Sequence, residues 1–179
     1  MKFVIVIIFL TISSVTAQSA ESKKIESLSP EERIEQAGFI LPKASTPVAN
    51  YVTWRRSGST LYLSGHVDCY KEKRLYGKVG ADLTVEQGYD SAQRIGLCML
   101  ATIKTAVGEL SQVNQVLKIT GMVNSAPDFG GQPQVINGFS DLFVTAFGAA
   151  GKGARAAVGM GSLPAKLAVE ISAIVELKE

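Results

Sequence analysis

Two long stretches with helical periodicity, set among short β-prone runs, constrain the fold of this chain most strongly. The first follows Thr84, which forms a capping-box pattern with Gln87, and its apolar residues recur at helical spacing as far as Gly108. The second begins near Pro133, carries a strong apolar stripe and stops at Gly148. Glycine directly after a helical pattern is typical of a C-terminal cap. We therefore predict two long helices that end at these glycines.

A shorter helix is predicted near the N-terminus. Ser29 can cap it, Pro30 suits the first helical position and Glu32 completes a second capping box. The helix should run to Ala37 and stop at Gly38, which adopts a left-handed conformation without a side-chain clash.

The remaining apolar runs are short and β-prone. The first two are separated by a Ser-Gly-Ser-Thr turn, which indicates a hairpin, and the others stand singly between and after the long helices. This order favours an antiparallel or mixed sheet with both long helices on one face, an α+β arrangement. The predicted strands are 51–56, 61–66, 116–123, 154–160 and 167–177.

The first residues of the chain have the order of a secretory signal peptide. A positive charge at Lys2 precedes an apolar run, and small residues follow as far as Ala17. The run is shorter than the roughly 20 residues that span a bilayer, so an uncleaved anchor is the weaker alternative. We predict a signal at 1–17, an N-terminal extension with a short helix at 18–47, and one domain at 48–179. The mature protein is then secreted or periplasmic, with no membrane attachment.

Composition narrows the possible functions. The net charge is only +2, and acidic and basic residues are interspersed, so the clustered basic residues of nucleic-acid binding are missing. One histidine and two separated cysteines make a metal site improbable, and no nucleotide-binding or nucleophile-elbow motif is present. We expect neither a metal nor a cofactor.

An oxidising compartment would permit a bridge between Cys69 and Cys98, but the apolar helical pattern around Cys98 favours a free cysteine.

Two charged residues stand out in the last predicted strands. Arg155 lies among alanines, and its fork of donors suits either a neighbouring acid on the surface or the carboxylate of a ligand. Alternation places Glu170 on the face opposite Val169 and Ile171, where solvent exposure is the simplest interpretation. Glu170 gains interest if its strand adjoins that of Arg155, because the acid would then have a charge partner.

Taken together, these residues resemble the YjgF/RidA family of reactive-intermediate deaminases, from about Tyr51 to Val175. The resemblance rests on the order and spacing of Ser64-Gly65, Asn137, Ala154-Arg155, Leu163-Pro164 and Val169-Glu170-Ile171. It implies a chorismate-mutase-like fold and a homotrimer whose sites lie in clefts between neighbouring chains. Further similarity at Gly77-Lys78-Val79-Gly80 indicates a longer branch of the family.

The resemblance also implies a function. In the family, an arginine binds the carboxylate of an imino acid, and a positioned water hydrolyses the C=N bond to give a keto acid and ammonia. Arg155 matches that arginine, and Glu170 is the candidate for orienting the water. A non-catalytic trimer that binds a small carboxylate or aromatic ligand in the same cleft is the alternative, and ribonuclease activity is a third, less favoured one. The positions expected to line or support the cleft are Tyr51, Ser64, Gly65, His66 and Asn137.

Overall fold

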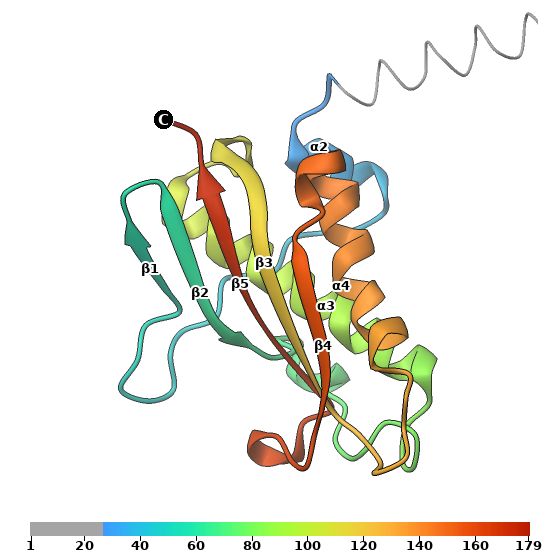
Figure 1. Cartoon of the computed structure of the whole chain (residues 1–179). Helices are drawn as coiled ribbons and strands as arrows, with labels where there is room; N and C mark the ends of the chain where they lie inside the picture. Colours follow the sequence, from blue (N-terminus) through green and yellow to red (C-terminus); the bar gives the residue numbers. More distant parts are fainter. Residues whose placement is uncertain (1–26) are drawn as a thin grey trace, which may run out of the picture.

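The computed structural model describes residues 27–179, and the predicted signal peptide at 1–17 lies outside this range. The described residues form a five-stranded sheet in the order β1-β2-β5-β3-β4 (Figure 1). Only β3 and β4 pair in parallel, and the other neighbours are antiparallel. The strands are β1 (Trp54–Ser57), β2 (Thr60–His66), β3 (Val113–Asn124), β4 (Ala154–Met160) and β5 (Val169–Leu177).

Both long helices cover the same face of the sheet, which confirms the predicted α+β class (Figure 1). Helix α3 packs against α4 so closely at Gly138 that a Cβ atom there would overlap the backbone carbonyl of Tyr89. A glycine at this point allows the two helix backbones to approach. The helices are α2 (Pro30–Gln36), α3 (Val85–Val107) and α4 (Gln132–Phe147), with short 3₁₀ turns at Lys71–Lys73, Leu110–Gln112, Gly148–Gly151 and Pro164–Lys166.

The helix ends follow the capping chemistry of the sequence. At α2 the Ser29 backbone N–H donates to the Glu32 carboxylate at 2.7 Å, and the Glu32 N–H donates back to the Ser29 hydroxyl. Thr84 and Gln87 form the same reciprocal pair at the start of α3. Gly108 ends α3 with a φ of 87°. The capping-box predictions at both helices are confirmed.

The hydrophobic core lies between the sheet and the helices. Along β5 every second residue from Val169 to Leu177 is buried toward the helices, while Glu170 and its alternates point to the opposite face. No α-helix of residues 27–179 lies on that opposite face, which we call the open face. Tyr62 and Val158 are 47% and 41% exposed there.

The segment before α3 crosses the ends of β3 and β5. Its Gly77 backbone N–H donates to the Lys166 carbonyl at 2.9 Å. The Lys78 ammonium donates to the Asn124 side-chain oxygen at 2.9 Å and to the Gly161 carbonyl at 2.8 Å. These contacts hold the segment before α3 against the end of the sheet at which β5 begins.

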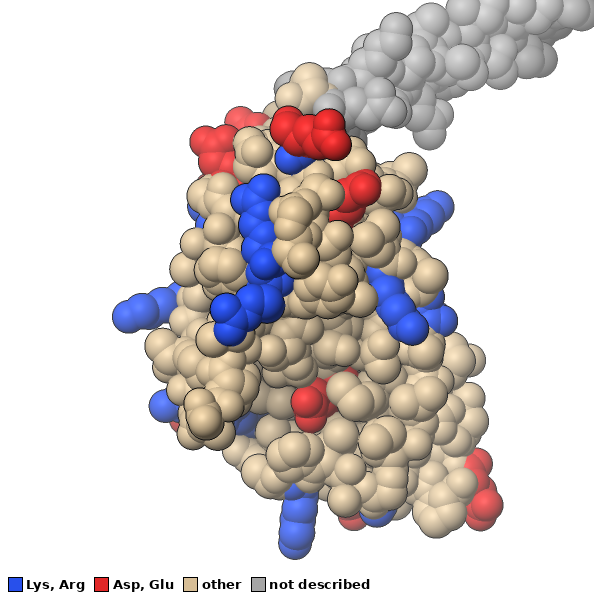
Figure 2. All heavy atoms as spheres, turned by 60° about the vertical axis from the view of Figure 1, so that its left-hand side comes forward, with Lys and Arg blue, Asp and Glu red and all other residues tan. Residues whose placement is uncertain are grey.

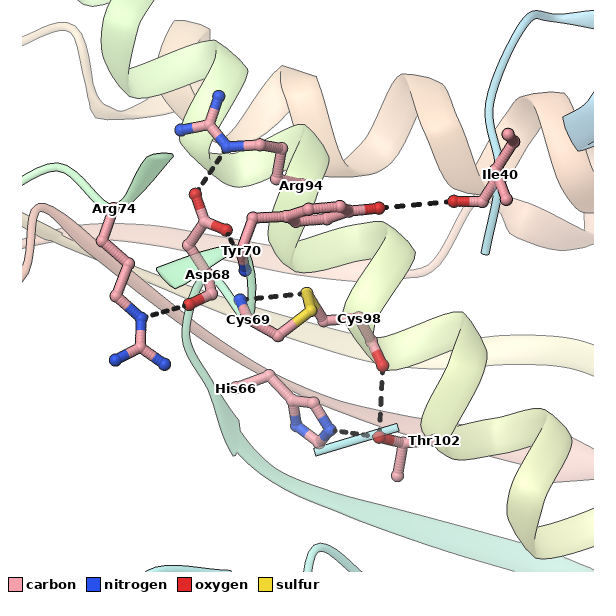
Figure 3. The surroundings of a disulfide bond; sticks show 9 residues. All are labelled: Ile40, His66, Asp68, Cys69, Tyr70, Arg74, Arg94, Cys98 and Thr102. Atoms are coloured by element: carbon pink, nitrogen blue, oxygen red, sulfur yellow. Dashed lines mark hydrogen bonds and ion pairs between the residues drawn. A yellow bond between two sulfur atoms is a disulfide. The ribbon is translucent and has the colours of Figure 1, made fainter. Parts of the chain in front are cut away.

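A disulfide joins the segment after β2 to the middle of α3 (Figure 3). Cys69 and Cys98 have Cα atoms 6.0 Å apart, and the Cys69 backbone N–H donates to the Cys98 sulfur. The expectation of a free Cys98 was therefore wrong. The apolar helical pattern correctly places Cys98 in the interior, but it carries no information on the partner that the fold brings within bonding distance.

A buried carboxylate lies directly before this bridge. Asp68 is 2% exposed; its carboxylate accepts from the Arg94 guanidinium on α3 and from the Tyr70 backbone N–H (Figure 3). Its backbone carbonyl accepts from Arg74. The segment after β2 is therefore held to α3 by charge as well as by the covalent link.

None of the helices within residues 27–179 is long and apolar enough to cross a membrane.

Candidate functional site

The Arg155 guanidinium is held in place by two neutral side chains of α4. Its Nη1 group donates to the Asn137 side-chain oxygen at 2.8 Å and to the Ser140 hydroxyl at 3.0 Å. No acid of the described chain lies within ion-pair distance of it, which excludes an intrachain surface ion pair there. The Nε and Nη2 donors have no partner among residues 27–179, so one edge of the guanidinium is available for a carboxylate.

A small recess of about 180 Å³ adjoins this guanidinium. Apolar side chains of β3 and α4 form part of its wall, and the segment before β4 forms the rest. Its size suits a small molecule rather than an extended ligand, since drug-sized ligands occupy about 300 Å³ or more. The lining residues are Ile119, Ser140, Val144, Gly151, Lys152, Gly153 and Arg155.

Glu170 occupies a different kind of environment, on the open face. Its side chain lies over Gly65, where a Cβ atom would overlap the Glu170 carboxylate. It has no hydrogen-bond or ion-pair partner within the described residues, and burial raises the pKa of its carboxyl above the ordinary value of 4.5. A desolvated, unpaired carboxylate can hold a water molecule and exchange a proton with it.

An irregularity in β2 creates the space that Glu170 uses. Between Leu63 and His66 the register with β5 slips by one residue, so Ser64 and Gly65 form a bulge. The Ser64 hydroxyl donates to the Val52 carbonyl at 2.6 Å, which brings the segment before β1 alongside the bulge. Tyr51, in that segment, is 44% exposed. Gly65 of the bulge thus lies against Glu170, and Tyr51 lies in the segment that Ser64 holds beside the bulge.

His66 points into the core instead. It is 5% exposed, its Nδ1 contacts the Ser64 carbonyl at 2.8 Å and its Nε2 contacts the Thr102 hydroxyl at 2.9 Å (Figure 3). Because a carbonyl only accepts, Nδ1 carries the proton in the neutral form of the ring. Burial lowers the pKa of the ring, which favours this neutral form. The structure gives no support for substrate binding by His66. Its contact with the Ser64 carbonyl instead stabilises the bulge from the core side of the sheet.

Arg155 and Glu170 lie on opposite faces of the sheet. Arg155 pairs with Ile119 of β3, which faces the helices, whereas Glu170 pairs with Met122, which faces the open side. Strand β3 also separates their two strands, so within one chain Glu170 does not have Arg155 as a charge partner. One chain brings Arg155 together with Asn137, and Glu170 together with Gly65, but it does not join the two groups.

The likeness to known proteins extends over most of the chain. Residues 31–176 match the family model described as "YjgF/chorismate_mutase-like, putative endoribonuclease". The chain belongs to the YjgF family. A curated relative, Protein TCP17 of Trypanosoma cruzi, is 38% identical over 151 residues, which cover 80% of this chain and 91% of that protein.

Several solved structures share the fold. A protein of unknown function from Agrobacterium tumefaciens is 43% identical, with a TM-score of 0.78 over 83% of this chain and 92% of that one. A structure named a putative endoribonuclease, from Shewanella oneidensis, is 32% identical, with a TM-score of 0.80 over 84% of this chain and 100% of that one. RidA from Psychrobacter sp. PAMC 21119 is 27% identical, with a TM-score of 0.52 over 75% of this chain and 94% of that one.

Two residues beside Arg155 were not predicted as parts of the site. Ser140 lies three residues after Asn137, so a helix places both side chains on one face, and this spacing is visible in the sequence of this YjgF-family chain. Lys152 lines the same recess as Arg155. Within residues 27–179 no cluster of three or more metal-binding side chains occurs.

Proposed function

We propose that this YjgF-family protein hydrolyses a small imino acid, or its enamine tautomer, to a keto acid and ammonia. The observation that carries the proposal is the Arg155 guanidinium. It is exposed beside a small recess, oriented by Asn137 and Ser140, and free of any acid within the described chain. Such a group is suited to bind a carboxylate through two parallel hydrogen bonds.

The reaction needs little more than orientation and a held water. The Nε and Nη2 groups of Arg155 bind the substrate carboxylate and fix the C=N carbon beside Glu170. Glu170 accepts a proton as water adds to that carbon and returns it to the nitrogen, which gives a carbinolamine. Glu170 then transfers the hydroxyl proton of the carbinolamine to the nitrogen, which leaves as ammonia while the carbonyl forms. One water is consumed and one ammonia is released, and no redox partner is required. Positioning of this kind accelerates hydrolysis of an already electrophilic imine.

Because Arg155 and Glu170 face opposite sides of one sheet, the proposed site takes each from a different chain. The proposed assembly is a homotrimer, because a head-to-tail interface repeats the same pair of surfaces around a ring. The exposed Tyr62 and Val158 on the open face are apolar surface that such an interface would cover.

The proposed place of action is outside the cytoplasm, in the periplasm or secreted. Support comes from the order of charged, apolar and small residues at 1–17 and from the Cys69–Cys98 disulfide, because such bridges persist in oxidising compartments. The proposed partner is a small carboxylate-bearing molecule.

The proposal is tested with imines that an amino-acid oxidase generates in the assay, by following their hydrolysis with catalase present. Wild type should speed imine decay and release of keto acid and ammonia above the uncatalysed rate, and Arg155→Ala should return both to it. Equal rates for the two proteins would overturn the proposal. Saturable binding of a small carboxylate that needs Arg155, with no turnover, would select the non-catalytic alternative.

A ribonuclease is a second candidate, because the matching family model and the Shewanella oneidensis relative carry the word endoribonuclease in their descriptions. Figure 2 shows one side of the molecule as a mostly uncharged surface with scattered basic and acidic side chains. Binding to the RNA backbone draws on clustered positive charge, so this surface favours the small-molecule proposal. Cleavage of single-stranded RNA that is lost in Arg155→Ala would support the ribonuclease instead.

A further inference from the structure

We infer that the recess beside Arg155 selects imino acids with a second carboxylate, and that Lys152 binds this second carboxylate. The inference rests on the proposed function and names its substrate class. The starting observation is that two cations, Lys152 and Arg155, line one recess of about 180 Å³ that has no acid in its lining.

Neither cation has an acidic partner within the described chain. The ion pairs Arg94–Asp68 and Lys104–Glu31 lie elsewhere in the fold, and within residues 27–179 no acid lies within ion-pair distance of Lys152 or Arg155. The Lys152 side chain is exposed and makes no hydrogen bond to any described residue. Two like charges that share a recess without a counterion favour a ligand with two negative charges.

The position of Lys152 is fixed by the backbone around it. A Cβ atom at Gly151 would overlap the Phe143 carbonyl of α4, and one at Gly153 would lie 2.7 Å from the Val116 side chain of β3. The Lys152 backbone N–H also donates to the Ala149 carbonyl at 3.1 Å. The lysine is thus presented from a tightly packed turn rather than from a free loop.

The remaining walls strengthen the effect of these charges. Ile119 and Val144 are apolar, and Ser140 already accepts from Arg155. Apolar walls lower the local dielectric, which increases the attraction between the cations and an anionic ligand. Arg155 then binds the carboxylate next to the imine, and Lys152 binds the carboxylate at the other end of a short chain.

The test compares two imines, one generated from aspartate and one from leucine by the matching amino-acid oxidases. Lys152→Ala should lower kcat/KM for the aspartate-derived imine about tenfold, through KM, as expected for loss of one charge-assisted contact. The leucine-derived imine should change less than about twofold, since it lacks the second charge. Lys152→Arg should retain the preference, and Lys152→Glu should reverse it. Lys71→Ala, which removes an exposed lysine of a distant turn, serves as the matched control.

The failure of this inference differs from failure of the proposed function. If Arg155→Ala abolishes hydrolysis of both imines while Lys152→Ala affects both equally, the inference is wrong and the proposed function stands. If wild type hydrolyses neither imine, the proposed function fails, and binding is measured with succinate and butyrate as probes. Tighter succinate binding that needs Lys152 then supports a dicarboxylate site, and equal affinity in wild type and Lys152→Ala overturns it.

Discussion

The Arg155 region and the Glu170 region hold their charged side chains in opposite environments. Arg155 is an exposed cation on the helix side of the sheet, oriented by hydrogen bonds that it donates to two α4 side chains. Glu170 is a half-buried carboxylate on the open face that has no partner in the described chain and lies over a glycine. The first group is set up to bind a charge, and the second is set up to remain unsatisfied until a water or substrate arrives.

The contrast predicts different kinetic consequences for the two regions. Changes at Arg155 should weaken binding of the substrate carboxylate as well as turnover, whereas changes around Glu170 should act on turnover with little effect on KM.

Arg155→Ala should lower kcat/KM by about a hundredfold to a thousandfold, because two charge-assisted hydrogen bonds to the substrate are lost. Arg155→Lys should recover only a small part, since an ammonium lacks the planar fork. Steady-state kinetics of imine hydrolysis measure both variants. A full recovery by lysine would show that charge alone, without the geometry set by Asn137 and Ser140, is sufficient.

Gly65→Ala should lower kcat about tenfold to a hundredfold with KM nearly unchanged, because the new methyl group displaces the Glu170 carboxylate. Gly130→Ala is the matched control, because a Cβ atom at Gly130 would meet no other atom. Gly58→Ala is less suitable, because Gly58 has a φ of 57°, which strains any residue with a side chain. An unchanged kcat in Gly65→Ala would remove Glu170 from the reaction.

Replacing both Cys69 and Cys98 by serine should lower the free energy of unfolding by about 3 to 4 kcal/mol, because a bridge that closes a loop of this size restricts the unfolded chain. Denaturant unfolding under oxidising conditions measures this change. Added reductant should destabilise wild type and leave the double variant unchanged. If the activity of the folded double variant also falls, it should fall through kcat, since the bridge anchors the segment that follows the Gly65 bulge.

At pH values above neutral, Glu170→Gln should raise the stability of the protein by a small amount, and it should lower the activity. The folded-state pKa of Glu170 is raised, so its ionisation becomes costly to the folded state as pH rises through that pKa. The gain in melting temperature of Glu170→Gln should therefore be present at pH 8 and vanish below about pH 4, where the carboxyl is protonated in both states. A gain of equal size at both pH values would exclude the desolvated carboxylate as its cause.

The sequence predicts the parts of this fold that depend on local chemistry. The capping boxes at Ser29 and Thr84 set where α2 and α3 begin, and strand alternation correctly places Glu170 on the face away from the core. These features depend on residues within one or two turns of each other, so a single stretch of sequence contains the information.

The site itself was only partly predictable. The family resemblance places Asn137 among the cleft positions, but the opposite orientations of Arg155 and Glu170 depend on the registers in which β4 and β5 pair with β3, which are properties of the whole sheet. The Cys69–Cys98 bridge was missed for the same reason, since it depends on a distance set by the packing of α3 against the sheet. The family resemblance places His66 among the positions that line or support the cleft, but it does not reveal that the His66 ring is buried against Thr102.

The most direct test of the account is complementation between two inactive variants. Arg155→Ala and Glu170→Gln are unfolded together, refolded as an equal mixture and assayed for imine hydrolysis. If each site takes Arg155 from one chain and Glu170 from its neighbour, random assembly leaves about one quarter of the sites with both native residues. Activity should then rise from background to about one quarter of that of refolded wild type. Activity that stays at background in properly assembled mixed oligomers would contradict a site shared between two chains.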